Sequence, residues 1–333
     1  MTDLEIIAYA EAQAETGKLL PRDSIIQLLA IETGSETWKE LGAAARRVTS
    51  RLTHDRAYLW GAIGVDFAPC SMNCDFCSLG EAWGIVTTER KYDEEETVKQ
   101  VREYVQQGVR WIVLRTTEFY SKEALMDMIR AIRTRVVGTY ELGLNIGEFD
   151  LETANWLHTC GVDFIYHSLR LGEGKDTHFD PKVRIATLEA VKASPLKLVF
   201  LVEPVGIEHS NEEIADICLL AANCNAIVTG AMARIPVPGT PLGVYPQIEE
   251  ERLAQIIAVT RLACGSHVPD ICVHPGSQLQ MEFGANVTVI ETGSVPRDSS
   301  CCCGGKWNQF DATKAKELFQ KAGYTVYATA EGE

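Results

Sequence analysis

Residues 57–77, AYLWGAIGVDFAPCSMNCDFC, join an apolar run to a group of three cysteines. The first part, up to about Val65, is rich in aromatic and β-branched residues and predicts a buried strand. Cys70, Cys74 and Cys77 follow it with the spacing Cys-x3-Cys-x2-Cys. Several thiols on one short loop directly after a strand predict a metal site at the end of that strand.

Downstream of this segment, short apolar runs alternate with amphipathic stretches, which is the pattern of parallel βα units. The predicted strands lie near 58–65, 110–115, 141–146, 162–167, 197–203, 225–230, 269–274 and 286–291. The predicted helices between them lie near 93–107, 121–135, 151–159, 183–193, 211–222, 247–264 and 276–283. Eight strands with intervening helices over about 235 residues predict an α/β fold, a closed (β/α)8 TIM-type barrel.

Two further segments flank this barrel, for which we predict the bounds 55–291. Residues 1–54 have apolar positions at helical spacing and predict an N-terminal helical extension. Residues 292–333 form a C-terminal tail with one predicted helix over 312–322. The tail also carries three adjacent cysteines, Cys301, Cys302 and Cys303.

Charge and hydropathy restrict the partners. The 333 residues have a formal net charge of −15 and 46% of them are hydrophobic, so the chain can form a large core but has no evident basic patch for nucleic acid or a membrane surface. No apolar run is long enough to span a bilayer, and residues 1–5 lack the features of a signal peptide. We therefore expect a cytoplasmic protein that binds neither nucleic acid nor membranes.

Eleven cysteines are many for a cytoplasmic chain, in which thiols stay reduced, so metal binding is their expected use. Three thiolates on one loop can hold three irons of a cubane cluster and leave the fourth iron open. The alternative is a zinc site or a set of free cysteines. Structural zinc sites usually use two Cys-x2-Cys pairs, and no second pair is present.

The arrangement Cys-x3-Cys-x-aromatic-Cys, with Phe76 as the aromatic residue, resembles the signature of the radical S-adenosylmethionine (SAM) superfamily. The resemblance implies a [4Fe-4S] cluster on Cys70, Cys74 and Cys77, with SAM on the remaining iron. In such enzymes an electron, from a donor such as ferredoxin or flavodoxin, cleaves SAM to methionine and a 5′-deoxyadenosyl radical, which takes hydrogen from an unactivated C–H bond. It implies a small-molecule or carrier-bound substrate.

The same resemblance assigns SAM contacts to the ends of later strands. Thr117 and Glu118 resemble the family's Gly-Glu pair, whose carboxylate accepts hydrogen bonds from the SAM ammonium. The segment from Asn145 to Glu148 resembles the part that meets the SAM ribose in the hydrogenase-maturase subgroup.

Two further contacts follow from the resemblance. Arg184 matches an arginine that reaches the SAM carboxylate, and segment 231–242, which contains Ile235, is similar to the motif near adenine. Each of these residues, taken singly, has a second interpretation. Glu118 and Glu148 are then charged loop residues in contact with solvent, and Arg184 is an arginine on the surface of a helix. Their placement at consecutive strand ends favours a common site.

The layout of residues 20 to 300 resembles the biotin synthase group, which includes an [FeFe]-hydrogenase maturase and methylornithine synthase. Two differences separate the chain from biotin synthase itself. The Asn-His-Asn motif after strand four is replaced by Tyr166-His167-Ser168, and strands two, three and five lack the cysteines that bind a second cluster.

The tail offers other thiols for a second cluster. Cys301, Cys302 and Cys303 precede two glycines beyond the last strand, and with Cys272 at the end of strand seven they predict an auxiliary iron–sulfur cluster at the barrel mouth. The preceding residues 297–300 resemble the tail of lipoyl synthase. The alternative is a tail that binds no metal.

Three hypotheses follow. The leading one is sulfur insertion at an unactivated carbon, of the biotin or lipoyl type, with an auxiliary cluster as the sulfur donor. In the second, the enzyme builds or rearranges a small molecule for a metallocofactor without sulfur transfer. In the third, the chain is a non-enzymatic iron–sulfur electron carrier, which Glu118 and Arg184 disfavour because a carrier needs no SAM pocket.

The remaining cysteines and two histidines have no definite role in these hypotheses. His167 and His274 end predicted strands and are expected to face the barrel mouth, either as contacts of the substrate or as structural groups. Core packing is the expected role of Cys160, Cys218, Cys224 and Cys264.

Overall fold

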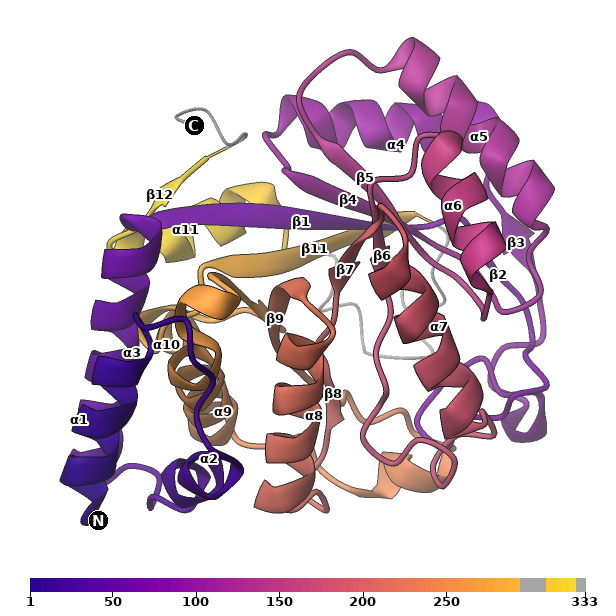
Figure 1. Cartoon of the computed structure of the whole chain (residues 1–333). Coiled ribbons are helices and arrows are strands. Elements are labelled where there is room, and N and C mark those ends of the chain that lie inside the picture. Colours follow the sequence, from indigo (N-terminus) through magenta and orange to yellow (C-terminus); the bar gives the residue numbers. More distant parts are fainter. Residues whose placement is uncertain (294–309, 328–333) are drawn as a thin grey trace.

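The computed structural model describes residues 1–293 and 310–327. A closed wall of parallel strands forms its centre (Figure 1). β1 pairs with β4 on one side and with β11 on the other, and the register with β11 runs from Tyr58↔Val287 to Gly64↔Gly293. The strands around the wall are β1 (Arg56–Gly64), β4 (Trp111–Arg115), β5 (Glu141–Asn145), β6 (Phe164–Tyr166), β7 (Lys197–Val199), β9 (Ala226–Ala233), β10 (Asp270–His274) and β11 (Val287–Gly293). The predicted (β/α)8 barrel is confirmed.

The predicted strand over 197–203 differs from the observed one. Two short strands occupy this part of the chain, β7 and β8 (Val202–Val205), and both pair with β9. The register shifts within both pairings, so the ladder is irregular at this point. A continuous apolar run does not encode such a shift, because every residue of the run is equally suited to burial.

Seven helices cover the outside of the barrel between successive strands (Figure 1). They are α4 (Glu94–Gln106), α5 (Lys122–Arg135), α6 (Leu151–Thr159), α7 (Pro181–Ala193), α8 (Asn211–Asn223), α9 (Glu250–Cys264) and α10 (Gln278–Glu282). Five of the seven begin with a polar side chain that accepts a hydrogen bond from a backbone N–H of the first turn. These caps are Asp93, Ser121, Asp150, Asp180 and Ser210.

The N-terminal extension consists of α1 (Asp3–Gln13), α2 (Arg22–Leu29) and α3 (Glu36–Thr53), which pack on α8 and α9. The predicted tail helix is also present, as α11 (Ala312–Lys321). After it, β12 (Thr325–Val326) pairs in parallel with the start of β1.

Apolar side chains fill the interior of the barrel towards the start of the strands. Trp60, Trp111 and Phe164 are the largest of this inner group. Because they close the barrel from within, a cavity is left at the carboxyl ends of the strands, where barrel enzymes place their active sites. The four cysteines predicted to pack in the core, Cys160, Cys218, Cys224 and Cys264, are buried. Within the described ranges, no helix combines the length and apolar character that crossing a membrane requires.

Candidate active site

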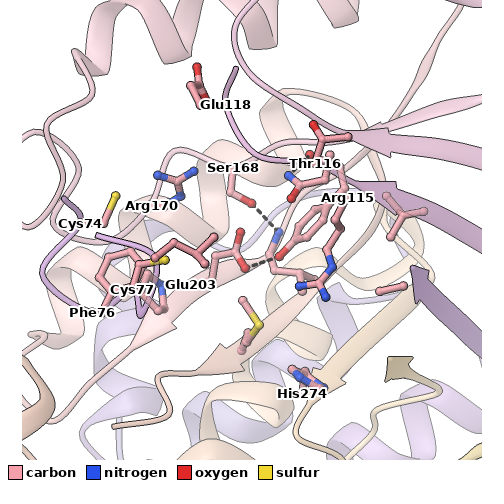
Figure 2. Close-up of a pocket in the computed structure, with 18 of the residues that line it drawn as sticks. Cys74, Phe76, Cys77, Arg115, Thr116, Glu118, Ser168, Arg170, Glu203 and His274 are labelled. Carbon is pink, nitrogen blue, oxygen red and sulfur yellow. Dashed lines mark hydrogen bonds between the residues drawn. The ribbon is translucent and has the colours of Figure 1, made fainter. Parts of the chain in front are cut away.

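A cavity of about 300 Å³ opens at the carboxyl ends of the barrel strands. Its wall combines the cysteine loop after β1 with the ends of β4, β5, β6, β8, β9, β10 and β11. Figure 2 shows Cys74, Phe76 and Cys77 on one side of this pocket, and Arg115 and His274 at a distance from them. The cavity therefore has a sulfur-lined part and a second part lined by charged side chains.

The cysteine loop is folded by its own backbone hydrogen bonds. The N–H of Cys70 donates to the carbonyl of Leu79 at 2.7 Å, and the N–H of Cys77 donates to the carbonyl of Cys74 at 2.9 Å. Asn73 adopts a left-handed backbone (φ 44°), and its side-chain oxygen accepts from the N–H of Ala82 at 2.9 Å. The loop is thus held in a tight turn that directs all three thiols to the cavity.

The donor set fits an open iron–sulfur cubane. Cys70, Cys74 and Cys77 are half-buried, free of disulfides and line the same cavity. Among the described residues that line it there is no fourth cysteine, so a cubane held here would keep one iron without a thiolate. Burial raises the pKa of the Cys70 thiol and raises that of Cys74 to about 12, so iron binding must displace these protons.

Glu118 follows β4 and faces the same cavity. Its carboxylate lies against Gly147, where a side-chain carbon would come within 2.6 Å of the Glu118 Oε1 atom. Gly147 therefore makes room for Glu118. Burial, together with the charge of Glu148, raises the pKa of Glu118. A cationic partner stabilises the ionised form of such a carboxylate, because the partner's charge offsets the cost of desolvation.

Glu148 and Arg184 lie near Glu118 and form an ion pair with each other. Arg184 is buried at the start of α7, and its Nη1 donates to Glu148 Oε1 at 2.7 Å while its Nη2 donates to the carbonyl of Ser168 at 2.7 Å. Glu148 also accepts from the hydroxyl of Thr187 at 2.5 Å. Arg184 lines the cavity, whereas Glu148 does not. Glu148 thus orients Arg184, and its own predicted contact with SAM stays a prediction.

His167 completes this buried group. Its Nε2 lies 3.3 Å from Glu148 Oε2, and burial lowers the pKa of the imidazole. Burial opposes the ionisation of Glu148 as well, but the contact with His167, the charge of Arg184 and the hydrogen bond from Thr187 outweigh it and lower the Glu148 pKa. Of the two histidines expected at the barrel mouth, His274 lines the cavity and His167 does not.

The charged part of the cavity contains residues for which the sequence predicted no role. Arg115 Nη1 lies 3.1 Å from Glu291 Oε1, and the hydroxyl of Tyr166 donates to Glu203 (Figure 2 labels Arg115 and Glu203). Burial raises the pKa of Glu203. These side chains share one signal in the sequence, because each is a polar residue near the carboxyl end of a predicted apolar strand.

The other predicted site residues lie in different places. Thr117 and Asn145 line the cavity, and Phe76 does so beside the thiols. Ile235, in the loop after β9, does not line it. Cys272 is fully buried in the inner core of the barrel, and burial raises its pKa. Three predicted ligands lie outside the described residues: Cys301, Cys302 and Cys303.

A second group of possible metal ligands lies outside this cavity. Asp176, Glu208 and His209 bring their side-chain atoms within 4.8 Å of one another. However, the N–H of Gly206 donates to His209 Nδ1 at 2.9 Å, so the neutral ring carries its proton on Nε2. That nitrogen then has no lone pair to offer, and this group does not fit a cation.

Comparison with known proteins bears on the family and the fold of the chain. No protein-family model matches the chain. A biotin synthase of Persephonella marina is 24% identical over 305 residues, covering 86% of this chain and 83% of the relative. A biotin synthase of Synechocystis sp. is 26% identical over 270 residues, covering 74% of this chain and 71% of the relative.

Solved structures with the same fold include methylornithine synthase (PylB), with a TM-score of 0.76 at 17% identity, covering 95% of this chain and 97% of that one. The FeFe-hydrogenase maturase HydG of Carboxydothermus hydrogenoformans has a TM-score of 0.77 at 16% identity, covering 97% of this chain and 79% of that one. At such sequence identities these structures support the assignment of the fold alone. The sequence relatives and the cysteine loop, on this fold, place the chain in the radical SAM superfamily. Within it, the chain belongs to the biotin synthase-like group.

Proposed function

We propose that the chain binds a [4Fe-4S] cluster through Cys70, Cys74 and Cys77 and uses it to cleave SAM reductively, so that hydrogen is abstracted from a small molecule in the barrel. The observation that carries this proposal is that all three thiols line one cavity together with Glu118 and Arg184. When bound, the cluster supplies the electron that breaks the sulfonium bond. An electron carrier would not need the two charged side chains in the same cavity.

The residues of the chain have separate tasks in this proposal. Glu118 accepts hydrogen bonds from the SAM ammonium, and Arg184 donates to the SAM carboxylate from an orientation fixed by Glu148 and Ser168. The charged part of the cavity, with Arg115 and Glu203, holds the substrate. The apolar interior of the barrel below it keeps water away from a reactive radical.

Glu118→Gln tests the assignment of the ammonium partner. The substitution keeps the shape of the side chain and removes its charge, so SAM should bind more weakly by about 1.5–3 kcal/mol, or roughly 10- to 150-fold. The measurement is a SAM titration of the anaerobically reconstituted protein.

Glu123→Gln, on the exposed first turn of α5, is the matched control and should leave SAM affinity unchanged. If Glu118→Gln binds SAM as tightly as the unaltered protein, Glu118 is not the partner of the ammonium.

A second candidate function is sulfur insertion, and similarity to the biotin synthases supports it. It needs a second cluster whose sulfide is spent in the reaction. Among the described residues, the cysteine that the sequence offered for it, Cys272, is buried in the core and does not line the cavity. The remaining ligands would therefore come from Cys301, Cys302 and Cys303.

Iron content separates the two functions. With sulfur insertion, reconstituted protein should hold about eight irons per chain, and replacement of the three tail cysteines by alanine should lower this to about four. SAM cleavage should survive the replacement, because Cys70, Cys74 and Cys77 remain. If the unaltered chain holds about four irons, sulfur insertion is excluded and hydrogen abstraction without sulfur transfer stands.

A further inference from the structure

Asp66 is a carboxylate whose role neither the sequence nor the SAM assignment explains. It lies on β2 (Asp66–Phe67), a short strand between the end of β1 and the cysteine loop. Its side chain is half-buried and does not line the cavity. Any effect of Asp66 on a ligand must therefore pass through another residue.

That residue is Thr117, and it uses both oxygens of the carboxylate. The backbone N–H of Thr117 donates to Asp66 Oδ1 at 2.7 Å, and the Thr117 hydroxyl donates to Asp66 Oδ2 at 2.5 Å. Two hydrogen bonds to one carboxylate fix the position and the orientation of residue 117, and hydrogen bonds to a charged acceptor are the stronger kind. Glu118 is the next residue in the chain.

The chain on either side of this contact is also fixed. The N–H of Val65 donates to the carbonyl of Arg115 at 2.8 Å, and the carbonyl of Val65 accepts from the N–H of Tyr92 at 2.7 Å. β2 pairs with β3 (Arg90–Lys91). On the other side, the N–H of Thr116 donates to the carbonyl of Asn145 at 3.2 Å. Asp66 therefore belongs to a hydrogen-bonded segment that continues, four residues later, into Cys70.

We infer that Asp66 is a positioning residue that sets the place of Glu118 relative to the cluster cysteines, through its paired hydrogen bonds to Thr117. The inference rests on the proposed function. Binding of the SAM ammonium needs Glu118 at a fixed distance from the open iron, because SAM reaches both at once. A hydrogen-bonded link from the cysteine loop to residue 117 provides this fixed distance without contacting SAM.

The test compares Asp66→Ala with Asp66→Asn in anaerobically reconstituted protein. Asp66→Ala removes both hydrogen bonds, so the SAM dissociation constant should rise about tenfold or more. Iron content and the electron paramagnetic resonance spectrum of the reduced cluster without SAM should stay as in the unaltered protein. Asp66→Asn should recover SAM affinity to within about threefold, because its amide oxygen can accept from the Thr117 N–H and its amide nitrogen can donate to the Thr117 hydroxyl.

Three further variants complete the experiment. Asp311→Ala removes an aspartate that caps α11, where it accepts from the N–H of Lys314 at 2.8 Å, and SAM affinity should not change. Thr117→Val removes the hydroxyl bond to Asp66 and should weaken SAM about threefold or more. Because Thr117 also lines the cavity, it is compared with Thr117→Ser, which keeps the hydroxyl and should bind SAM as the unaltered protein does. Thr117→Val is the test of the inference if Asp66→Ala does not fold.

The outcomes separate this inference from the proposed function. The inference is overturned if Asp66→Ala binds SAM with unchanged affinity. Where Asp66→Ala does not fold, unchanged affinity in Thr117→Val has the same meaning. A folded Asp66→Ala protein that loses iron, or an Asp66→Asn protein that does not recover affinity, also overturns it. A protein that binds and cleaves SAM in spite of these results keeps the proposed function. Unaltered protein that neither binds nor cleaves SAM contradicts the proposed function itself.

Discussion

Cys74→Ala is expected to leave the reconstituted protein with almost no iron and to abolish the formation of 5′-deoxyadenosine. Cys74 is the middle ligand of the loop, and its thiol lies with those of Cys70 and Cys77 in one cavity. With two thiolates, two irons of the cubane would lack a protein ligand, and the cluster would be labile. Iron analysis after anaerobic reconstitution and desalting gives the result directly.

Cys160→Ala is the matched control for this loss. Cys160 is buried at the end of α6, where its Sγ lies 3.3 Å from Arg130 Nη2, and it does not line the cavity. We expect it to keep the iron content of the unaltered protein. If Cys74→Ala also keeps that iron content, the cysteine loop is not the cluster site.

Arg261→Ala is expected to lower the free energy of unfolding by about 3–5 kcal/mol. Arg261 lies on α9 with none of its surface exposed, and burial lowers its pKa to about 10, so it stays charged at neutral pH. It donates to the carbonyl of Gly284 from Nε (3.2 Å) and Nη2 (3.0 Å), to that of Pro269 from Nη1 (2.6 Å), and to Asn286 Oδ1 (2.7 Å). Alanine would leave these buried acceptors without the arginine and create a cavity.

Urea unfolding followed by circular dichroism measures this change. The control is Arg130→Ala on α5, whose side chain is 56% exposed and pairs with Asp127 three residues earlier. Its removal should change the free energy of unfolding by less than about 0.5 kcal/mol. An equally small change for Arg261→Ala would show that α9 is not anchored to the barrel through this guanidinium.

The barrel and the cysteine loop were predictable because their signals are local. The alternation of apolar runs and amphipathic stretches marks each βα unit, and the spacing of Cys70, Cys74 and Cys77 fits within one loop. The placement of Glu118 and Arg184 on the same cavity was also expected, since the carboxyl ends of parallel strands meet at one end of a barrel.

Other features depend on contacts between distant parts of the chain. Asp66 and Thr117 are 51 residues apart, and nothing near either residue indicates the pairing. The Tyr166–Glu203 pair joins β6 to β8. The position of Glu203 depends on the register shift in the pairing of β8 with β9, which the predicted strand 197–203 did not show. Buried parallel strands are apolar on both faces, so the sequence does not show which strand-end side chains point inward.

The partners of Glu148 also depend on distant contacts. Its carboxylate accepts hydrogen bonds from Arg184 and Thr187 on α7 and does not line the cavity. The motif around Glu148 does not show these partners, because they lie 36 and 39 residues further along the chain. The SAM contact that the resemblance implied for Glu148 stays a prediction.

Reductive cleavage of SAM tests the central claim most directly. Reconstituted protein is incubated anaerobically with SAM and dithionite, and 5′-deoxyadenosine and methionine are quantified by chromatography. We predict that the unaltered chain forms both products and that the variant with Cys70, Cys74 and Cys77 all replaced by alanine forms neither. Equal product formation by that variant, or none by unaltered protein that holds its cluster, would contradict the assignment of this cavity to radical SAM chemistry.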